Sequence, residues 1–433
     1  MIVKGRKENM AAAGDNKAWV FCRLSEEEYR EFREKNYPNS DFLNTVEAMN
    51  LKESNGWRVE YFGVKDDGDI IAATPICSIP VMKVYRYYYA SRGFLMDMDN
   101  RELLTFLTKN LKDTLAKQKG LYMVVDPYIF LVERDENGNI VEGGYDNSRY
   151  IDNFCSLGYE YYGSPTDYST AAYVNWQFVL DLEGKSKDEL WKAFDQSNRT
   201  YINKTKNQGI EIRELAEDEY HIFTDMENRT AERRGFAARE SDFYKKLKAA
   251  YGDKMSVLLA YIDLDQYDAK LKEEVDSLEK ELESINQVLQ ENPESKKSLG
   301  RQKEADKQLV ACKKRLNESK ELRERYGRVL NISSSIFLNF DVEVIYLFSA
   351  NEGDLRQFAA PYAIQWYTIQ KALDEGKKRY NFYGISGNFS KDADDYGVFE
   401  YKRAFRGRVE QYIGDFILPL RGMYKVYRFL KRK

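Results

Sequence analysis

The chain has 433 residues, 43% of them hydrophobic, and its 33 tyrosines and 23 phenylalanines supply apolar mass for more than one core. This length and composition exclude a disordered chain and favour two or more domains. The net charge of −4, from 67 basic and 71 acidic residues, excludes a protein that coats nucleic acid through its overall charge. Any RNA contact must then come from local basic patches.

Cysteine and histidine content narrows the chemistry. Four cysteines without CxxC spacing indicate neither a zinc site nor a disulfide framework, and they favour a reducing cytoplasm. His221 is the only histidine, so we expect no metal site and no histidine-activated nucleophile, and we assign it a surface or capping role. No signal peptide and no run of ~20 apolar residues is visible, which predicts a cytoplasmic protein able to work at a membrane surface.

The first 165 residues predict a mixed α/β arrangement. Ser25 and the three glutamates after it are typical of a helix N-terminus. A Gly-rich turn before a helix, which would hold the pyrophosphate of acetyl-CoA, is not visible and counts against a CoA-dependent acetyltransferase. Apolar patterning predicts strands at residues 19–24, 59–64, 70–79, 85–94 and 121–125, and helices after Ser25, at 42–57 and at 101–119.

A second mixed unit follows. Its longest predicted helix, residues 186–207, ends in Lys204 and Lys206, which we interpret as complement to the helix dipole, with an RNA contact as the alternative. The other predicted helices are 220–234, a short one from Ser241, and 361–375, and the predicted strands are 175–181, 210–214, 255–262, 328–339 and 343–349.

Residues 267–326 interrupt this second unit with a charged helical hairpin. Pro293 ends the first helix of the hairpin. The heptad seam of this helix is made by Leu271, Val275, Leu278, Leu282, Ile285 and Leu289. Each arm of about 25 residues extends ~37 Å at helical rise. The pattern predicts an antiparallel coiled coil, and a spacer or dimer contact stays open as its role.

Residues 380–408 read YNFYGISGNFSKDADDYGVFEYKRAFRGR. Alternation predicts a strand, an acidic loop at 388–396 that can fold over a cleft, and a second strand from Val398. That second strand carries Lys402 beside Tyr401 and Phe405, either as a snorkelling surface residue or as a cation aimed into a pocket.

Residues 421–433 hold six basic residues and no acidic ones, interleaved with aromatic and aliphatic residues. This mixture suits an anionic membrane surface or RNA, and a solvated helix is the alternative.

The run FYGISG, the acidic loop, Gly-Val-x-Glu-Tyr-Lys-x-x-Phe and Tyr-Ile-Gly-Asp-Phe together resemble the C-terminal part of the FemABX aminoacyltransferases. The resemblance extends over most of the chain and implies an α/β (α+β) fold of two GNAT-like acyltransferase domains. The inserted coiled-coil arm resembles that of FemA-type members, where it is likened to the tRNA-binding arm of a synthetase. The implied domains are 1–165 with 406–433 packing on it, 166–266 with 327–405, and the arm at 267–326.

The resemblance also implies a function. FemABX enzymes transfer an amino acid from aminoacyl-tRNA to the side-chain amine of the stem peptide of a peptidoglycan precursor, here expected to be lipid II, and so build the interpeptide bridge. No cofactor beyond the aminoacyl-tRNA co-substrate is expected. In FemX-like enzymes a Phe-Lys pair is linked to the transfer step, and its positions fall on Tyr401 and Lys402. We expect Lys402 to stabilise the oxyanion.

The same resemblance carries acceptor-binding positions onto Lys52, Asp97 and Arg239. Asp97 is expected to orient or deprotonate the acceptor amine, and Lys52 and Arg239 are expected to clamp the precursor's pyrophosphate. Two positions depart from the family pattern: Phe94 replaces a proline, and Phe243 replaces a tyrosine and so lacks a hydroxyl for a phosphate. Without the resemblance, Lys52 and Asp97 would read as ordinary surface charges.

Two rival functions stay open at this stage. One is a non-catalytic adaptor that dimerises through the hairpin and docks on membranes through its basic end. The other is an aminoacyl-tRNA–protein transferase, which shares donor and fold but lacks phosphate anchors.

Overall fold

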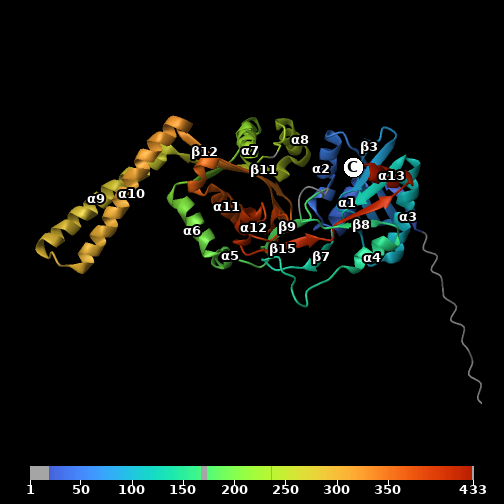
Figure 1. Cartoon of the computed structure of the whole chain (residues 1–433), viewed down its shortest axis with the longest axis horizontal. Helices are drawn as coiled ribbons and strands as arrows, with labels where there is room; N and C mark the ends of the chain where they lie inside the picture. Colours follow the sequence, from blue (N-terminus) through green and yellow to red (C-terminus); the bar gives the residue numbers. More distant parts are fainter. Residues whose placement is uncertain (1–18, 167–172, 236, 432–433) are drawn as a thin grey trace, which may run out of the picture. The chain divides into compact units, whose positions relative to one another are not determined.

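The computed structural model describes residues 19–166, 173–235 and 237–431 (Figure 1). Arg432 and Lys433, two of the six basic residues noted at the end of the chain, lie outside the described residues. The chain divides into two compact units. Unit 1 is Met1–Val132, Tyr145–Pro165 and Tyr412–Lys433, and unit 2 is Glu133–Gly144 and Thr166–Gln411.

Unit 1 contains a single sheet flanked by helices. Its strands are β1 (Val20–Leu24), β2 (Arg58–Asp66), β3 (Asp69–Val81), β4 (Tyr85–Ala90), β5 (Leu95–Met96), β6 (Gly120–Val125), β8 (Glu160–Gly163) and β16 (Asp415–Pro419). Its helices are α1 (Glu26–Asn36), η1 (Phe42–Asn44), α2 (Val46–Ser54), α3 (Arg101–Lys117), α4 (Arg149–Ser156) and α13 (Met423–Lys431). Strand β7 (Phe130–Glu133) lies where the chain passes between the units.

The strand order in unit 1 is β1-β2-β3-β4-β6-β16-β8, antiparallel except for the parallel pair β4 and β6. Helix α3 makes the crossover between these two strands, and its leucines recur at helical spacing on the face that packs on the sheet (Leu103, Leu104, Leu107, Leu111, Leu115). As predicted, the Ser25 hydroxyl accepts from the N–H of Glu28, and Glu28 completes a capping box. Strands β8 and β16 were not predicted.

Unit 2 repeats this architecture with strands of its own. They are β9 (Trp176–Asp181), β10 (Glu211–Glu214), β11 (Met255–Asp263), β12 (Val329–Asn339), β13 (Glu343–Asn351), β14 (Arg379–Gly384) and β15 (Arg408–Tyr412). The helices are α5 (Lys187–Ala193), α6 (Gln196–Asn207), η2 (Glu217–Glu219), α7 (Tyr220–Arg234), α8 (Ser241–Tyr251), η3 (Gly252–Lys254), α9 (Leu264–Glu291), α10 (Lys296–Tyr326), η4 (Gly353–Phe358), α11 (Ala360–Asp374) and α12 (Tyr396–Arg403).

Strands in unit 2 follow the order β10-β11-β12-β13-β14-β9-β15, and only β13 and β14 are parallel. These two strands pair from Glu343 opposite Arg379 to Ile345 opposite Asn381. Beyond that point β13 continues to Asn351 and β14 to Gly384 without further pairing to each other. The two strands therefore separate at their carboxyl ends, which is where open α/β sheets commonly bind ligands.

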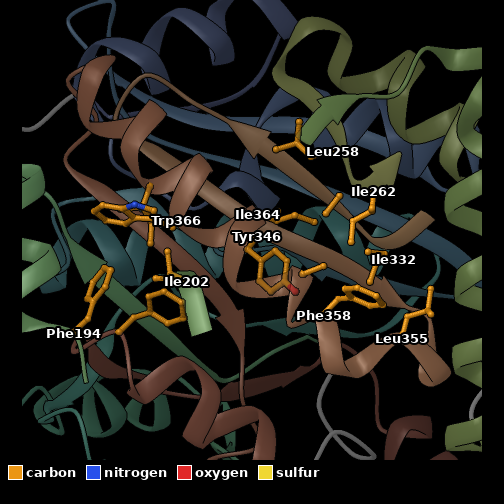
Figure 2. Packing of buried hydrophobic residues seen from close by; sticks show 14 of the residues in the cluster. Phe194, Ile202, Leu258, Ile262, Ile332, Tyr346, Leu355, Phe358, Ile364 and Trp366 are labelled. Atoms are coloured by element: carbon orange, nitrogen blue, oxygen red, sulfur yellow. The ribbon is translucent and has the colours of Figure 1, made fainter. Parts of the chain in front are cut away.

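The core of unit 2 lies between the sheet and helices α6 and α11. Phe194, Ile202, Ile364 and Trp366 are among the side chains drawn there, and Tyr346 lies among them (Figure 2). Phe194 packs edge-on against Trp366, with ring centroids 5.5 Å apart. Burial of this many large apolar groups fixes α11 on the sheet and so fixes the N-terminus of α11 beside the separated strands.

Helices α9 and α10 form the predicted antiparallel hairpin (Figure 1). Leu271, Val275, Leu278, Leu282 and Ile285 are buried, whereas Val288 beyond them is exposed. At the base, Arg323 forms ion pairs with Asp265 and Asp268 at 2.8 and 3.0 Å. The hairpin is thus stabilised by its own seam, and its base is fixed by ion pairs.

The two helices of the hairpin carry opposite charge. Helix α9 has nine acidic and three basic residues, and α10 has eleven basic and five acidic residues. Arg301–Glu281 and Lys313–Glu279 ion pairs, both 2.7 Å, join the helices. Lys303, Lys307 and Lys314 are exposed at spacings of four and seven, so they lie along one face of α10.

The predicted second strand after Val398 is wrong, because residues 396–403 form helix α12. Phe399, Lys402 and Phe405 are buried at three-residue steps, a spacing that suits a helix and its last turn. The run also contains only one β-branched residue, Val398. Lys402 is therefore delivered by a helix that follows the acidic loop.

The predicted single helix at 186–207 is two helices, α5 and α6. Phe194 and Asp195 both have an extended ψ of 147°. The N–H of Asp195 donates to the carbonyl oxygen of Ala404 at 3.0 Å, and its carboxylate pairs with Arg406. These contacts with the segment after α12 stabilise the break at Phe194 and Asp195, so α5 does not continue into α6 as one helix.

Among the described residues, no helix is long and apolar enough to cross a membrane.

Candidate active site

A pocket of about 600 Å³ lies in unit 2 where β13 and β14 separate. Strand β13, the first turn of α11, the end of β14 and helix α12 all contribute lining residues. Three of the predicted site residues, Lys402, Tyr401 and Arg239, line this one pocket. The separation of β13 and β14 is the physical cause of this pocket.

Lys402 forms one wall of the pocket. Its side chain is only 5% exposed, and its Nζ donates to the carbonyl oxygens of Gly384 at 2.5 Å and Tyr383 at 3.3 Å. An ammonium has three protons, so these two bonds leave one proton for another acceptor. Because the residue lines the pocket, that acceptor can be a bound substrate atom.

A register shift in β14 frees the two carbonyls that Lys402 uses. Pairing with β9 jumps from Asn381 opposite Val179 to Gly384 opposite Gln177. Tyr383, inside the bulge, has a φ of 61°, and its N–H donates to the side chain of Asn381 at 2.7 Å. A left-handed non-glycine residue beside a ligand pocket is a strained arrangement of the kind found at functional sites.

Burial lowers the pKa of Lys402 to about 7, and the charge of Asp395 opposes this change. Asp395 precedes α12 and accepts from the N–H and hydroxyl of Ser386 at 2.8 and 2.6 Å. The carboxylate therefore ties the acidic loop to the strand that it follows. Because its pKa is lowered, the Lys402 ammonium loses its proton more easily than an exposed lysine does.

Tyr401 packs next to Lys402 through its ring. The ring lies edge-on to Tyr362 and Phe405, with centroids 4.9 and 5.7 Å away. Burial first, and then neighbouring tyrosine hydroxyls, raise the pKa of Tyr401 well above its usual value. The phenol thus stays protonated.

Arg239 reaches the same pocket from the segment before α8. Its guanidinium pairs with Glu227 at 3.1 Å and lies 4.1 Å above the ring of Phe348. Glu227 is 4% exposed and also accepts from the hydroxyl of Tyr244. These contacts orient a side chain that is 42% exposed, so its remaining N–H groups can bind an anion.

Phe243 is not among the pocket's lining residues. Its ring lies 5.7 Å below the guanidinium of Arg239 and 6.1 Å from Phe348, edge-on. The predicted substrate-binding role for Phe243 stays a prediction, and the contact that the structure gives it supports the orientation of Arg239.

Lys52 lies in unit 1, in the last turn of α2. Its Nζ lies 4.6 Å from the ring of Trp57 and 5.4 Å from that of Tyr89. Burial lowers the pKa of Lys52, and Cys77 and Asp126 act in the opposite direction. Lys52 is thus a half-buried cation held by aromatic rings.

Asp97 also lies in unit 1, just after β5. The carboxylate is exposed and accepts from the N–H of Asp99 at 3.0 Å, and its carbonyl accepts from Asn100 at 3.1 Å. These contacts form a turn that leads into α3. The structure thus gives Asp97 a local structural role and leaves its predicted catalytic role a prediction.

Sequence reasoning missed a buried ion-pair network in unit 1. Arg92, 1% exposed, pairs with Asp126 at 3.1 Å and Asp41 at 3.4 Å and stacks 3.7 Å from the ring of Tyr412. Tyr89 and Tyr412 donate to the two carboxylates at 2.7 Å each. The only sequence signals were the Arg92–Gly93 turn and the aspartate after β6. The parallel strands β4 and β6 stay paired as far as Ala90 opposite Val125. The Arg92–Asp126 ion pair follows directly after them, whereas in unit 2 a pocket follows the parallel strands.

His221 is exposed, and its Nδ1 lies 3.0 Å from the carbonyl oxygen of Asp218. It lies among the first residues of α7, as the sequence indicated. The four cysteines are free, and none of them lines the pocket.

Sequence and structure comparisons identify known proteins that are similar to this chain. The sequence profile of the FemAB family matches residues 24–432. Aminoacyltransferase FemA of Staphylococcus aureus, from strains RF122 / ET3-1 and N315, is 34% identical over 414 residues, covering 95% of this chain and 98% of the relative. The crystal structure of FemX matches at a TM-score of 0.76 and 20% identity, over 95% of this chain and 100% of that chain.

The likeness to FemX confirms the predicted α/β (α+β) fold class, and the structure has two mixed sheets. The family profile spans nearly the whole chain, and FemA exceeds 30% identity over nearly its full length. The chain is therefore an aminoacyltransferase that belongs to the FemAB family.

Proposed function

We propose that this enzyme transfers an amino acid from aminoacyl-tRNA to the side-chain amine of the stem peptide of a lipid-linked peptidoglycan precursor, lipid II, and so builds the interpeptide bridge. The observation that carries the proposal is Lys402. Its ammonium is held by two backbone carbonyls, and it faces a pocket that also contains Arg239.

The proposed step is direct aminolysis. The acceptor nitrogen attacks the ester carbonyl carbon of the donor, and an oxyanion forms on the carbonyl oxygen. The C–N bond forms, the ester C–O bond breaks, and the proton lost by the amine leaves with the ribose hydroxyl. Among the described residues that line the pocket there is no cysteine and no histidine, which favours this route over a covalent aminoacyl-enzyme.

Lys402 stabilises the oxyanion in this proposal. Two protons of its ammonium are fixed by Gly384 and Tyr383, so the third points toward a preorganised acceptor position. The first turn of α11, which contributes Pro361 and Tyr362 to the pocket, adds the positive end of a helix dipole. Both features act on charge that develops in the transition state.

Acceptor contacts are proposed on the strength of the family resemblance. Lys52 and Arg239 each contact phosphate oxygens of the precursor, and Asp97 orients or deprotonates its amine. Two observations support the cations: aromatic rings hold Lys52 half-buried, and Glu227 and Phe348 orient Arg239. The guanidinium fork suits a pyrophosphate oxygen pair.

The hairpin is proposed to contact the tRNA. A chain with a net charge of −4 needs a local basic patch to bind RNA. The basic helix α10 supplies one, with Lys303, Lys307 and Lys314 on one face. A donor of this kind places the reaction in the cytoplasm. No cofactor beyond the charged tRNA is proposed.

The test is a product assay. The protein is incubated with a pool of charged tRNAs and lipid II, and the added residue is identified from the mass of the product. The proposal expects a single amino acid on the stem-peptide side-chain amine, lost when the tRNA is deacylated. Transfer that persists without charged tRNA, or addition to protein N-termini instead, would contradict it.

A further inference from the structure

The outward face of α13 in unit 1 is apolar. Met423, Val426, Phe429 and Leu430 recur at helical spacing, and each is between 40% and 63% exposed. A helix that presents four large apolar side chains to solvent on one face is a marker of an interaction surface.

The opposite face of α13 is firmly attached to unit 1. Tyr424 and Tyr427 pack on the ring of Tyr122, with centroids 5.1 and 5.7 Å away. Arg428 pairs with Glu160 at 2.6 Å and lies 5.3 Å from the ring of Tyr162. The helix, labelled α13 in Figure 1, is therefore held in one rotation, and its apolar side chains stay exposed.

The turn between β3 and β4 adds a second apolar element beside α13. Met82 is 41% and Val84 61% exposed, and Arg421 lies 6.0 Å from the ring of Tyr85, the residue after Val84. Met82 and Lys83 both have positive φ, 50° and 64°, where glycine or asparagine is usual. The chain thus places an exposed methionine where a small polar residue would relieve strain, which indicates a use for the apolar side chain.

The charged residues within these two segments are all positive, and Arg428 among them pairs with Glu160. Residues 82–84 and 421–431 contain no acidic residue, and Lys83, Arg421 and Lys425 are exposed there. Basic residues flank the apolar side chains, which project from the surface of a helix and from the tip of a turn. This arrangement matches an interfacial helix better than a peptide-binding site.

We propose that the surface formed by residues 82–84 and the outward face of α13 docks on an anionic lipid bilayer. Val426, Phe429 and Leu430 enter the acyl boundary, and Lys83 and Lys425 contact lipid phosphates. The choice of a bilayer over a protein rests in part on the proposed function, because a lipid-linked acceptor is presented at such a surface.

The test uses the full chain and vesicles that contain no peptidoglycan precursor. Phosphatidylcholine vesicles with and without phosphatidylglycerol are sedimented with the parent, and the affinity is compared with that of V426S/L430S, M82S/V84S and K425E. Ile140→Ser is the control, since Ile140 lies in unit 2 and is, at 63%, at least as exposed as each of the substituted apolar residues. Thermal melts establish that each variant is folded.

We expect the parent to bind phosphatidylglycerol vesicles. Each double variant should lose roughly tenfold or more in affinity, and K425E roughly fivefold to tenfold, on these vesicles only. Ile140→Ser should bind as the parent does. No binding by the parent, or equal binding by V426S/L430S, overturns the proposal.

A second outcome that overturns it is self-association. If sedimentation velocity shows that the parent dimerises and V426S/L430S does not, while neither binds vesicles, the surface is an interface between two copies. Transfer to a soluble precursor is measured in parallel. A parent that does not bind vesicles but still transfers the amino acid sinks the docking surface alone, and a parent that does not transfer it sinks the proposed function.

Discussion

The Nζ of Lys402 lies 2.5 Å from the carbonyl oxygen of Gly384, although one residue is on helix α12 and the other ends strand β14. The carbonyl is available because the ladder between β14 and β9 shifts register just before it. The acidic loop between them is short and is tied down by Asp395 and Ser386. This contact joins helix α12 to the bulged strand and so holds the Lys402 ammonium in a fixed position.

A stability prediction follows from the burial of Lys402. Its pKa of about 7 lies below the ordinary value of 10.5, so between these two pH values the unfolded chain binds more protons than the folded one. The parent's free energy of unfolding should therefore rise with pH across this window, by on the order of 4 kcal/mol. Lys402→Met has no such titration.

Urea unfolding of the parent and Lys402→Met at several pH values between 7 and 10.5 checks this prediction. The parent should gain on the variant as the pH rises. Lys391→Met, at an exposed lysine of the acidic loop, is the control and should track the parent. A pH-independent difference between the parent and Lys402→Met would show that Lys402 titrates normally in the fold.

A second prediction concerns Arg239. Charge-assisted bonds to phosphate contribute ~1.5–3 kcal/mol each, so Arg239→Ala should weaken binding of a soluble pyrophosphate-bearing precursor by roughly tenfold to a hundredfold. Arg239→Lys keeps the charge but loses the fork, and it should fall between the two. Added salt should weaken binding to the parent more than to Arg239→Ala.

Calorimetry measures these affinities. Arg213→Ala is the matched control, because Arg213 also pairs with a glutamate, Glu219, at 2.7 Å, but it does not line the pocket. It should bind the precursor as the parent does. Equal affinities for the parent and Arg239→Ala would remove Arg239 from the acceptor site.

A third prediction concerns the hairpin. Replacing residues 273–314 by a short Gly/Ser turn removes the distal hairpin and keeps its base, including the Arg323 ion pairs with Asp265 and Asp268. The body should fold, since the removed seam packs on itself. The KM for aminoacyl-tRNA should rise at least tenfold while precursor affinity stays constant.

Charge variants refine the same test. Lys303, Lys307 and Lys314 replaced together by alanine should raise the KM for charged tRNA and flatten its salt dependence, because three phosphate contacts are lost. Lys272→Ala/Lys280→Ala, on the acidic helix α9, should leave both unchanged. An unaltered KM in the triple variant would favour a spacer or dimer role for the hairpin.

Much of the fold could be predicted because its signals are local. The helix N-terminus at Ser25 follows from residue type, and the heptad seam from Leu271 and the alternation in β14 follow from side-chain periodicity, all within a few residues. Helix α12 was missed because Val398 to Lys402 satisfies a strand pattern over a short window. Its buried three-residue steps become clear only once Phe405 is known to be buried.

The site was only partly readable. Lys402 and Arg239 came from resemblance, and no local pattern indicates that α12 would bring Lys402 to the carbonyls of a bulge. Arg92 could not be foreseen as a buried cation, since its partners Asp41 and Asp126 lie 51 and 34 residues away and Tyr412 comes from the far end of the chain. Contacts between such distant segments depend on tertiary packing, which periodicity does not encode.

The rate of the transfer step in Lys402→Met tests the central claim most directly. With enzyme in excess and both substrates saturating, rapid quench should show a rate lower by on the order of a hundredfold, while calorimetry shows unchanged precursor affinity, because an oxyanion partner acts in the transition state. Lys391→Met should react at the parent's rate. An unchanged rate in Lys402→Met would contradict the assignment of Lys402 as the oxyanion partner.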